Sequence, residues 1–199
     1  MNTVAEQVAS HLLQIKAIKL EPNHPFTWAS GWKSPIYCDN RKTLSYPEVR
    51  TYIRDQFVNL IKTKYPQVEL IAGVATGAIA QGALVAQELG LPFVYVRSAA
   101  KNHGLENLIE GEYKEGQKVV VVEDLISTGG SSLQAVLGMV AIFTYGFQKA
   151  IDNFTNAHCV LDTLSDYNAM IDLAQKTGYV QESDVAKLKE WRLSPESYK

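Results

Sequence analysis

Five short runs rich in valine and isoleucine constrain the fold of this chain most strongly. They lie at residues 69–73, 93–97, 118–123, 137–143 and 156–161. None alternates cleanly between apolar and polar residues, which is typical of strands buried on both faces of a parallel sheet. Helix-like segments surround them, and strands that alternate with helices predict an α/β domain with a mostly parallel sheet flanked by helices.

The expected helices precede, separate and follow these strands. They cover residues 4–18, 47–64, 78–89, 167–176 and 183–192. The first shows amphipathic spacing, and the second starts at Pro47, a residue tolerated in a first turn. Residues 26–39 are aromatic and irregular instead, and Gly31 and Pro35 there indicate short strands joined by turns.

Length and charge narrow the class of protein. A chain of 199 residues predicts a single domain. Its net charge of −2 gives no reason to expect nucleic acid or an anionic membrane as a partner. Cys38 and Cys159 fit no zinc pattern and suit a reducing cytosol. The start of the chain does not resemble a signal peptide, and we therefore expect a cytoplasmic protein.

The connection after Ser131 is shorter than a parallel crossover needs. Only residues 132–135 stand between it and the next expected strand, whereas a crossover takes a dozen residues or more. Either the connection is unusual, or about ten residues next to Ala135 are absent from the sequence, and we favour the absence because both flanks look intact. A measured intact mass of 22.1 kDa would exclude the absence of these residues.

The strongest chemical signal is the segment 119–131, which reads VVVVEDLISTGGS. Glycines after a strand let backbone N–H groups approach a phosphate, and a helix N-terminus favours the anion. Glu123 and Asp124 would repel phosphate but suit sugar hydroxyls, directly or through hydrated Mg²⁺. The segment therefore predicts a site for a phosphorylated sugar. The alternative is a plain strand end followed by a glycine-rich helix start.

A long polar connection at residues 98–117 adds cations. Long loops in compact domains often act as lids. Arg97 precedes this loop and can form bidentate hydrogen bonds with phosphate oxygens. Lys101 and His103 lie within it and could close over a charged leaving group and exclude water.

Segment 119–131 closely resembles the phosphoribosyl pyrophosphate (PRPP) motif of the type I phosphoribosyltransferases. Residues 26–39, 95–104 and 138–147 narrow the resemblance to the orotate phosphoribosyltransferases, over nearly the whole chain. The resemblance implies that orotate and PRPP give orotidine 5′-monophosphate and pyrophosphate with Mg²⁺. It also implies one domain over residues 1–199: a hood, mainly residues 1–45 plus the C-terminal helix, and a core at about 66–165.

The resemblance further implies a homodimer in which each mobile loop serves the neighbour's active site. Arg97, Lys101 and His103 match PRPP-contacting residues, and Ser127 matches a hydroxyl that contacts orotate. Lys101, His103 and Asp124 are the expected catalytic residues, and no protein side chain is expected as a metal ligand. The matching PRPP loop consists of Glu123, Asp124, Leu125, Ile126, Ser127, Thr128, Gly129, Gly130 and Ser131.

Some positions depart from the pattern of this family. Ser98, Ala29 and Thr76 stand where many members have a basic residue, and no arginine occurs at 143–147. The orotate carboxylate thus has no evident cationic partner, and we suspect Lys33 and backbone N–H groups near residues 36–38.

Three alternatives stay open. The segment 73–77 is either a tight turn or part of the pyrophosphate site. The chain could be a phosphoribosyltransferase for another base, which a titration of orotate, uracil and purines would reveal. It could also be a PRPP-sensing regulator that binds RNA or DNA, although no basic run supports this.

Overall fold

The computed structural model describes residues 3–28, 31–97, 108–128 and 136–197. A six-stranded sheet with the order β10-β9-β8-β5-β6-β7 forms its centre. Its parallel strands are β5 (Leu70–Val74), β6 (Phe93–Val96), β8 (Val119–Ile126), β9 (Gly138–Thr144) and β10 (Leu161–Asp166). The short β7 (Ile109–Glu110) pairs antiparallel with β6 at one edge. The predicted α/β class with a mostly parallel sheet is confirmed.

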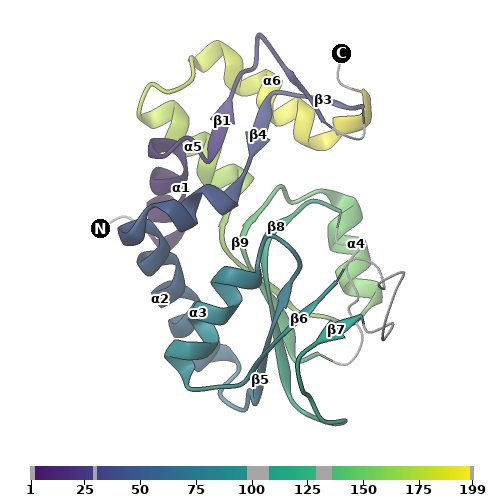
Figure 1. Cartoon of the computed structure of the whole chain (residues 1–199). Helices are drawn as coiled ribbons and strands as arrows, with labels where there is room; N and C mark the ends of the chain where they lie inside the picture. Colours follow the sequence, from purple (N-terminus) through teal and green to yellow (C-terminus); the bar gives the residue numbers. More distant parts are fainter. Residues whose placement is uncertain (1–2, 29–30, 98–107, 129–135, 198–199) are drawn as a thin grey trace.

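Helices cover both faces of this sheet (Figure 1). Helices α1 (Val4–Gln14), α2 (Pro47–Lys64), α3 (Ile79–Leu89) and α5 (Tyr167–Lys176) share one large apolar core with the sheet. Val120, Val122 and Val140 point into that core. Val121 and Met139 belong to a second cluster, together with α4 (Gln148–Asn156). Neighbouring strand residues thus contribute to different cores, which explains why the strands are apolar throughout.

Short strands and the C-terminal helix form a smaller layer at one end of the sheet (Figure 1). Strand β1 (Ile18–Leu20) pairs with β4 (Ile36–Cys38), and β2 (Phe26–Thr27) pairs with β3 (Lys33–Ser34). The 3₁₀ helix η1 (Asn40–Ser45) follows β4, while α6 (Glu182–Leu193) and η2 (Pro195–Ser197) come from the other end of the chain. Trp191 Nε1 on α6 donates to the Lys33 carbonyl at 3.2 Å, which joins the two chain ends.

The bounds of two predicted elements differ most from the structure. The first helix ends at Gln14 rather than residue 18, because Lys16 takes a positive φ of 54° and Ile18 begins β1. The last strand starts at Leu161, not residue 156, because the preceding segment is helix α4, which the sequence did not reveal. Helix α4 is the crossover between the parallel strands β9 and β10.

The connection between β8 and β9 is short in the structure as well. The two strands are parallel neighbours, with Val120 opposite Gly138 and Ile126 opposite Thr144. Only residues 127–137 join them, fewer than a helical crossover requires. The parts of this connection that the structure describes, 127–128 and 136–137, contain no helix.

No helix in the described ranges is both long and apolar enough to cross a membrane.

Candidate active site

The acidic pair lies within strand β8 rather than after it. The expected strand stops at residue 123, but β8 continues to Ile126, so pairing with β9 fixes the backbone of both acids. Glu123 lies opposite Ala141, and Leu125 lies opposite Phe143. The pair therefore occupies the carboxyl half of a central strand, the region where open α/β sheets bind ligands.

Glu123 is the buried member of the pair, with 7% of its surface exposed. Loss of hydration raises the pKa of its carboxyl group to about 9, and the adjacent Asp124 carboxylate contributes to this shift. Its Oε1 accepts a hydrogen bond of 2.9 Å from the Asp124 backbone N–H. At neutral pH the Glu123 side chain is therefore protonated and can donate a hydrogen bond.

The Asp124 carboxylate lies directly against Gly77. A methyl group added at Gly77 would come within 2.5 Å of Cγ and of both carboxylate oxygens. Gly77 follows β5, the strand beside β8. The glycine is thus required by the close approach of an acid from the neighbouring strand, a reason that the segment 73–77 alone does not reveal.

Asn40 connects the hood to the acidic pair. This residue begins η1 and is 1% exposed. Its Nδ2 donates to the Asp124 carbonyl at 2.6 Å, and its Oδ1 accepts from Cys38 Sγ at 3.2 Å. Burial, together with the charges of Asp124 and Asp39, raises the pKa of the Cys38 thiol well above its usual value. Sequence reasoning missed Asn40, because nothing in its local pattern marks it.

Arg97 follows β6 and retains donor capacity. Its Nη1 lies 3.5 Å from Glu110 Oε1, and its backbone N–H donates to the Leu108 carbonyl. Its Nε is buried and has no hydrogen-bond partner among the described residues. A buried unpaired N–H is costly, and an anionic oxygen would satisfy it.

The rest of the predicted PRPP loop is only partly described. Leu125 packs against the larger core and Ile126 is buried in the smaller one, so their side chains serve packing. Ser127 and Thr128 follow them, and the Thr128 carbonyl accepts from Asn153 Nδ2 of α4 at 2.7 Å. The remaining predicted residues lie outside the described part of the chain: Lys101, His103, Gly129, Gly130 and Ser131.

Two of the donors suspected for the orotate carboxylate have partners within the hood. Lys33 Nζ donates to Thr27 Oγ1 at 2.8 Å across the β2–β3 pair. The Ile36 backbone N–H donates to Ser34 Oγ at 3.2 Å.

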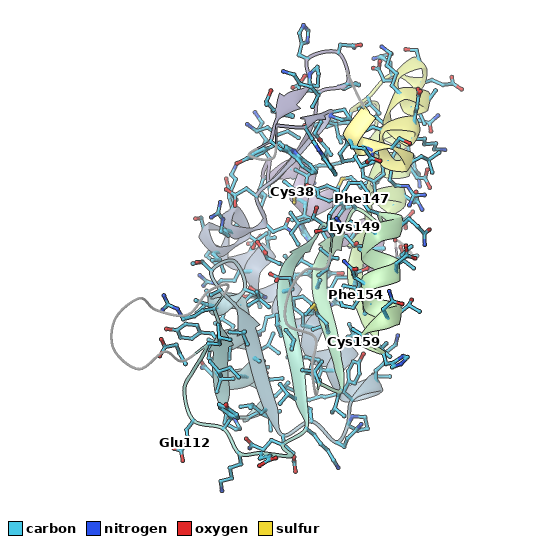
Figure 2. All side chains as sticks on the ribbon, turned by 90° about the vertical axis from the view of Figure 1, so that its right-hand side faces the viewer. Cys38, Glu112, Phe147, Lys149, Phe154 and Cys159 are labelled. Carbon is cyan, nitrogen blue, oxygen red and sulfur yellow. The ribbon has the colours of Figure 1, made fainter. Side chains whose placement is uncertain are left out.

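A cavity of about 280 Å³ opens beside Thr128. It lies between the start of α4, the end of α6 and the hood, and Figure 2 labels two of its residues, Phe147 and Lys149, at one end of α4. Phe147 stacks on Tyr145 with the ring centroids 5.3 Å apart. The cavity is lined by Trp32, Thr128, Phe147, Gln148, Lys149, Arg192, Leu193, Pro195 and Glu196.

Comparisons with known proteins agree with this architecture. A model of the phosphoribosyl transferase domain family matches residues 44–143. The orotate phosphoribosyltransferase of Porphyromonas gingivalis is 59% identical, over 100% of this chain and 99% of its own. That of Phocaeicola vulgatus is 60% identical, over 98% and 97%. The first alignment extends over 208 positions although the chain has 199 residues, so the relative has residues without a counterpart here.

Solved structures share the fold at lower identity. The orotate phosphoribosyltransferase of Aeropyrum pernix has a TM-score of 0.74 and 24% identity, over 87% of this chain and 99% of its own. The UMP synthase of Leishmania donovani has a TM-score of 0.78 and 22% identity, over 94% of this chain and 42% of its own.

Proposed function

This chain belongs to the orotate phosphoribosyltransferases, and from that membership we propose that it transfers the phosphoribosyl group of PRPP to orotate, giving orotidine 5′-monophosphate and pyrophosphate. The whole-length similarity to enzymes of that name supports the reaction. The observation in the structure that carries the proposal is the acidic pair in β8, with Asp124 against Gly77. A carboxylate in the carboxyl half of a central strand supports a sugar ligand at this edge, because open α/β sheets bind ligands there.

Asp124 and Glu123 have different roles in this proposal. The partly exposed Asp124 accepts hydrogen bonds from the ribose hydroxyls. The protonated Glu123 limits the negative charge beside the substrate, because two adjacent carboxylates would repel its phosphates. Asp124 also lies near the positive charge that develops on the sugar as pyrophosphate departs. Orotate binds as an anion, so no general base is needed to activate it.

The 5′-phosphate binds at residues 127–131 in this proposal. Hydroxyl groups and glycine N–H groups there suit a phosphate dianion. The hydrogen bond from Asn153 to the Thr128 carbonyl anchors the start of this segment to α4. Ser127 is the proposed hydroxyl contact to orotate.

Arg97, Lys101 and His103 stabilise the pyrophosphate group in this proposal. The free Nε of Arg97 supports an anionic ligand at the end of β6. Lys101 and His103 would act from the partner subunit of a homodimer, which makes each active site depend on both chains.

Mg²⁺ would be held mainly through PRPP. No cluster of three His, Cys, Asp or Glu side chains able to hold a metal occurs in the described ranges. With Glu123 protonated, Asp124 is the charged carboxylate of the pair that could contribute a ligand to the metal. This donor set fits a hydrated cation that takes most of its ligands from the substrate. When bound, the metal neutralises charge on the departing pyrophosphate.

A direct assay tests the function. PRPP-dependent consumption of orotate should occur with Mg²⁺ and should weaken strongly without it. Uracil and the purine bases, at the same concentration, are the controls for the base. Activity with a purine alone would contradict the proposed substrate. DNA or RNA binding at physiological salt without turnover would instead support a regulator.

A further inference from the structure

The carboxylate of orotate requires cationic recognition, and this inference rests on the proposed function. A carboxylate that leaves water for a binding site needs charged or strong hydrogen-bond donors. Several cations near the site are already committed. Arg41 Nε contacts Asp39 at 2.7 Å and Lys33 donates to Thr27, while Arg97, which pairs with Glu110, is assigned to the pyrophosphate in the proposed function.

Arg192 is not committed in this way. It lies in the last turn of α6 and is partly buried. Its Nη1 makes one long hydrogen bond, 3.4 Å, to the Gly146 carbonyl just beyond β9. Within the part of the chain that the structure describes, it forms no ion pair. Most of the guanidinium fork is therefore available to a ligand.

The cavity next to Arg192 has the character of a site for a small aromatic anion. Lys149 adds a second positive charge, and Glu196, an exposed residue on the rim, adds one negative charge. Phe147 and Trp32 supply ring surfaces. A volume of about 280 Å³ lies just below the usual range for small-molecule pockets, which suits one pyrimidine ring better than a dinucleotide.

The cavity is also connected to the proposed sugar site. Thr128 lines it and directly follows Ser127, at the end of the strand that carries Asp124. On the other side, Phe147 stacks on Tyr145. Burial raises the pKa of the Tyr145 phenol, and the Asp124 charge adds to this shift. A base in the cavity would therefore lie beside the carboxyl end of β8 rather than on a remote surface.

We propose that Arg192 is a specificity-determining residue that binds the carboxylate of orotate through its guanidinium fork. Residues of α6 thus supply, from the C-terminal end of the chain, the cation that the hood segment and the segment 143–147 do not provide. Lys149 assists as a second, more exposed charge.

The test compares two nucleotides that differ only in the carboxylate. Orotidine 5′-monophosphate carries it and uridine 5′-monophosphate does not. Calorimetry gives the dissociation constant of each for the wild type, Arg192→Gln and Arg192→Lys. Lys189→Gln is the matched control, because it removes the same charge from an exposed position of the same helix.

We expect Arg192→Gln to raise the dissociation constant of the carboxylated nucleotide about 10- to 100-fold, the usual loss for a hydrogen bond to a charged group. The dissociation constant of the uridine nucleotide should change less than about twofold, since this nucleotide has no carboxylate to contact the guanidinium group. Arg192→Lys should give an intermediate value, because an ammonium keeps the charge but not the bidentate geometry. Lys189→Gln should preserve the wild-type preference.

The outcomes separate this inference from the proposed function. If Arg192→Gln binds both nucleotides as tightly as the wild type does, or loses affinity for both equally, Arg192 does not recognise the carboxylate. If the wild type shows no preference for the carboxylated nucleotide and no orotate turnover, the proposed function fails first. Circular dichroism of each variant verifies folding, and Arg192→Lys still tests the inference if Arg192→Gln does not fold.

Discussion

Asn40 donates a hydrogen bond of 2.6 Å to the backbone carbonyl of Asp124, a residue 84 positions later in the chain. Asn40 is almost fully buried, at 1% exposure. The bond joins the hood to the strand that carries the acidic pair. It fixes the backbone of Asp124 without using the Asp124 carboxylate.

Removal of this amide should affect both stability and activity. We expect Asn40→Ala to lower the free energy of unfolding by about 1–3 kcal/mol, because the Asp124 carbonyl loses its buried partner. Turnover should fall about 10- to 100-fold, since small displacements of reacting groups are costly. Urea denaturation and the orotate assay measure the two effects. Asn59→Ala, at an exposed position of α2, should leave both unchanged.

A side chain at Gly77 should displace the Asp124 carboxylate. In Gly77→Ala the new methyl group would overlap three carboxylate atoms, and overpacking of this kind costs about 1–3 kcal/mol. Activity should fall with it. The same substitution in an Asp124→Ala background should cost much less stability, because the overlapping atoms are gone. Equal losses in the free energy of unfolding in the two backgrounds, measured by urea denaturation, would show that the contact between Gly77 and the Asp124 carboxylate does not limit this position.

The buried Glu123 should make stability depend on pH. Its pKa rises from 4.5 to about 9 on folding, so between these values the folded state holds a proton that the unfolded state has lost. The free energy of unfolding should then fall with rising pH, by at most about 1.4 kcal/mol per pH unit. The Glu123 contribution is complete below pH 4.5 and is lost as the pH approaches 9.

Glu123→Gln removes this titration. We expect the variant to be more stable than the wild type at pH 8, with a flatter dependence between pH 5 and 9 in chemical denaturation without substrate. Asp152→Asn, at an exposed position of α4, is the control and should keep the wild-type slope. A Glu123→Gln slope equal to that of the wild type would mean that Glu123 is ionised in the folded protein.

Lys101 is expected to act mainly in the transition state. Lys101→Ala should lower turnover far more than it lowers the affinity for PRPP, because a cation aimed at developing charge adds little to ground-state binding. Steady-state kinetics and calorimetry with PRPP separate the two quantities. A loss of affinity alone would contradict this role.

A shared active site makes a further prediction about mixed dimers. Inactive Lys101→Ala and Asp124→Ala chains, when mixed, should recover part of the activity, because one site of each hybrid then combines two intact contributions. Native mass spectrometry verifies that hybrids form. Hybrids that form without any activity would exclude a loop that serves the neighbouring subunit.

Local sequence patterns predicted four strands of the sheet and singled out the acidic pair. Hydrophobic runs predicted β5, β6, β8 and β9 because burial on both faces demands apolar residues at every position. The order of acids, hydroxyls and glycines in 119–131 predicted a sugar-phosphate site, because each residue type there suits one part of such a ligand. Helix α4 was not predicted, because no element was assigned to residues 148–155.

The sequence by itself determined the class of fold, the acidic pair as the candidate sugar site and the resemblance to the family. Only the tertiary structure decided which distant residues complete the site. Asn40, Gly77 and Arg192 have no distinctive local pattern, and their parts follow from what packs against them: a carbonyl, a carboxylate and a cavity. Such contacts depend on how separate elements meet in space, which no short segment of the chain encodes.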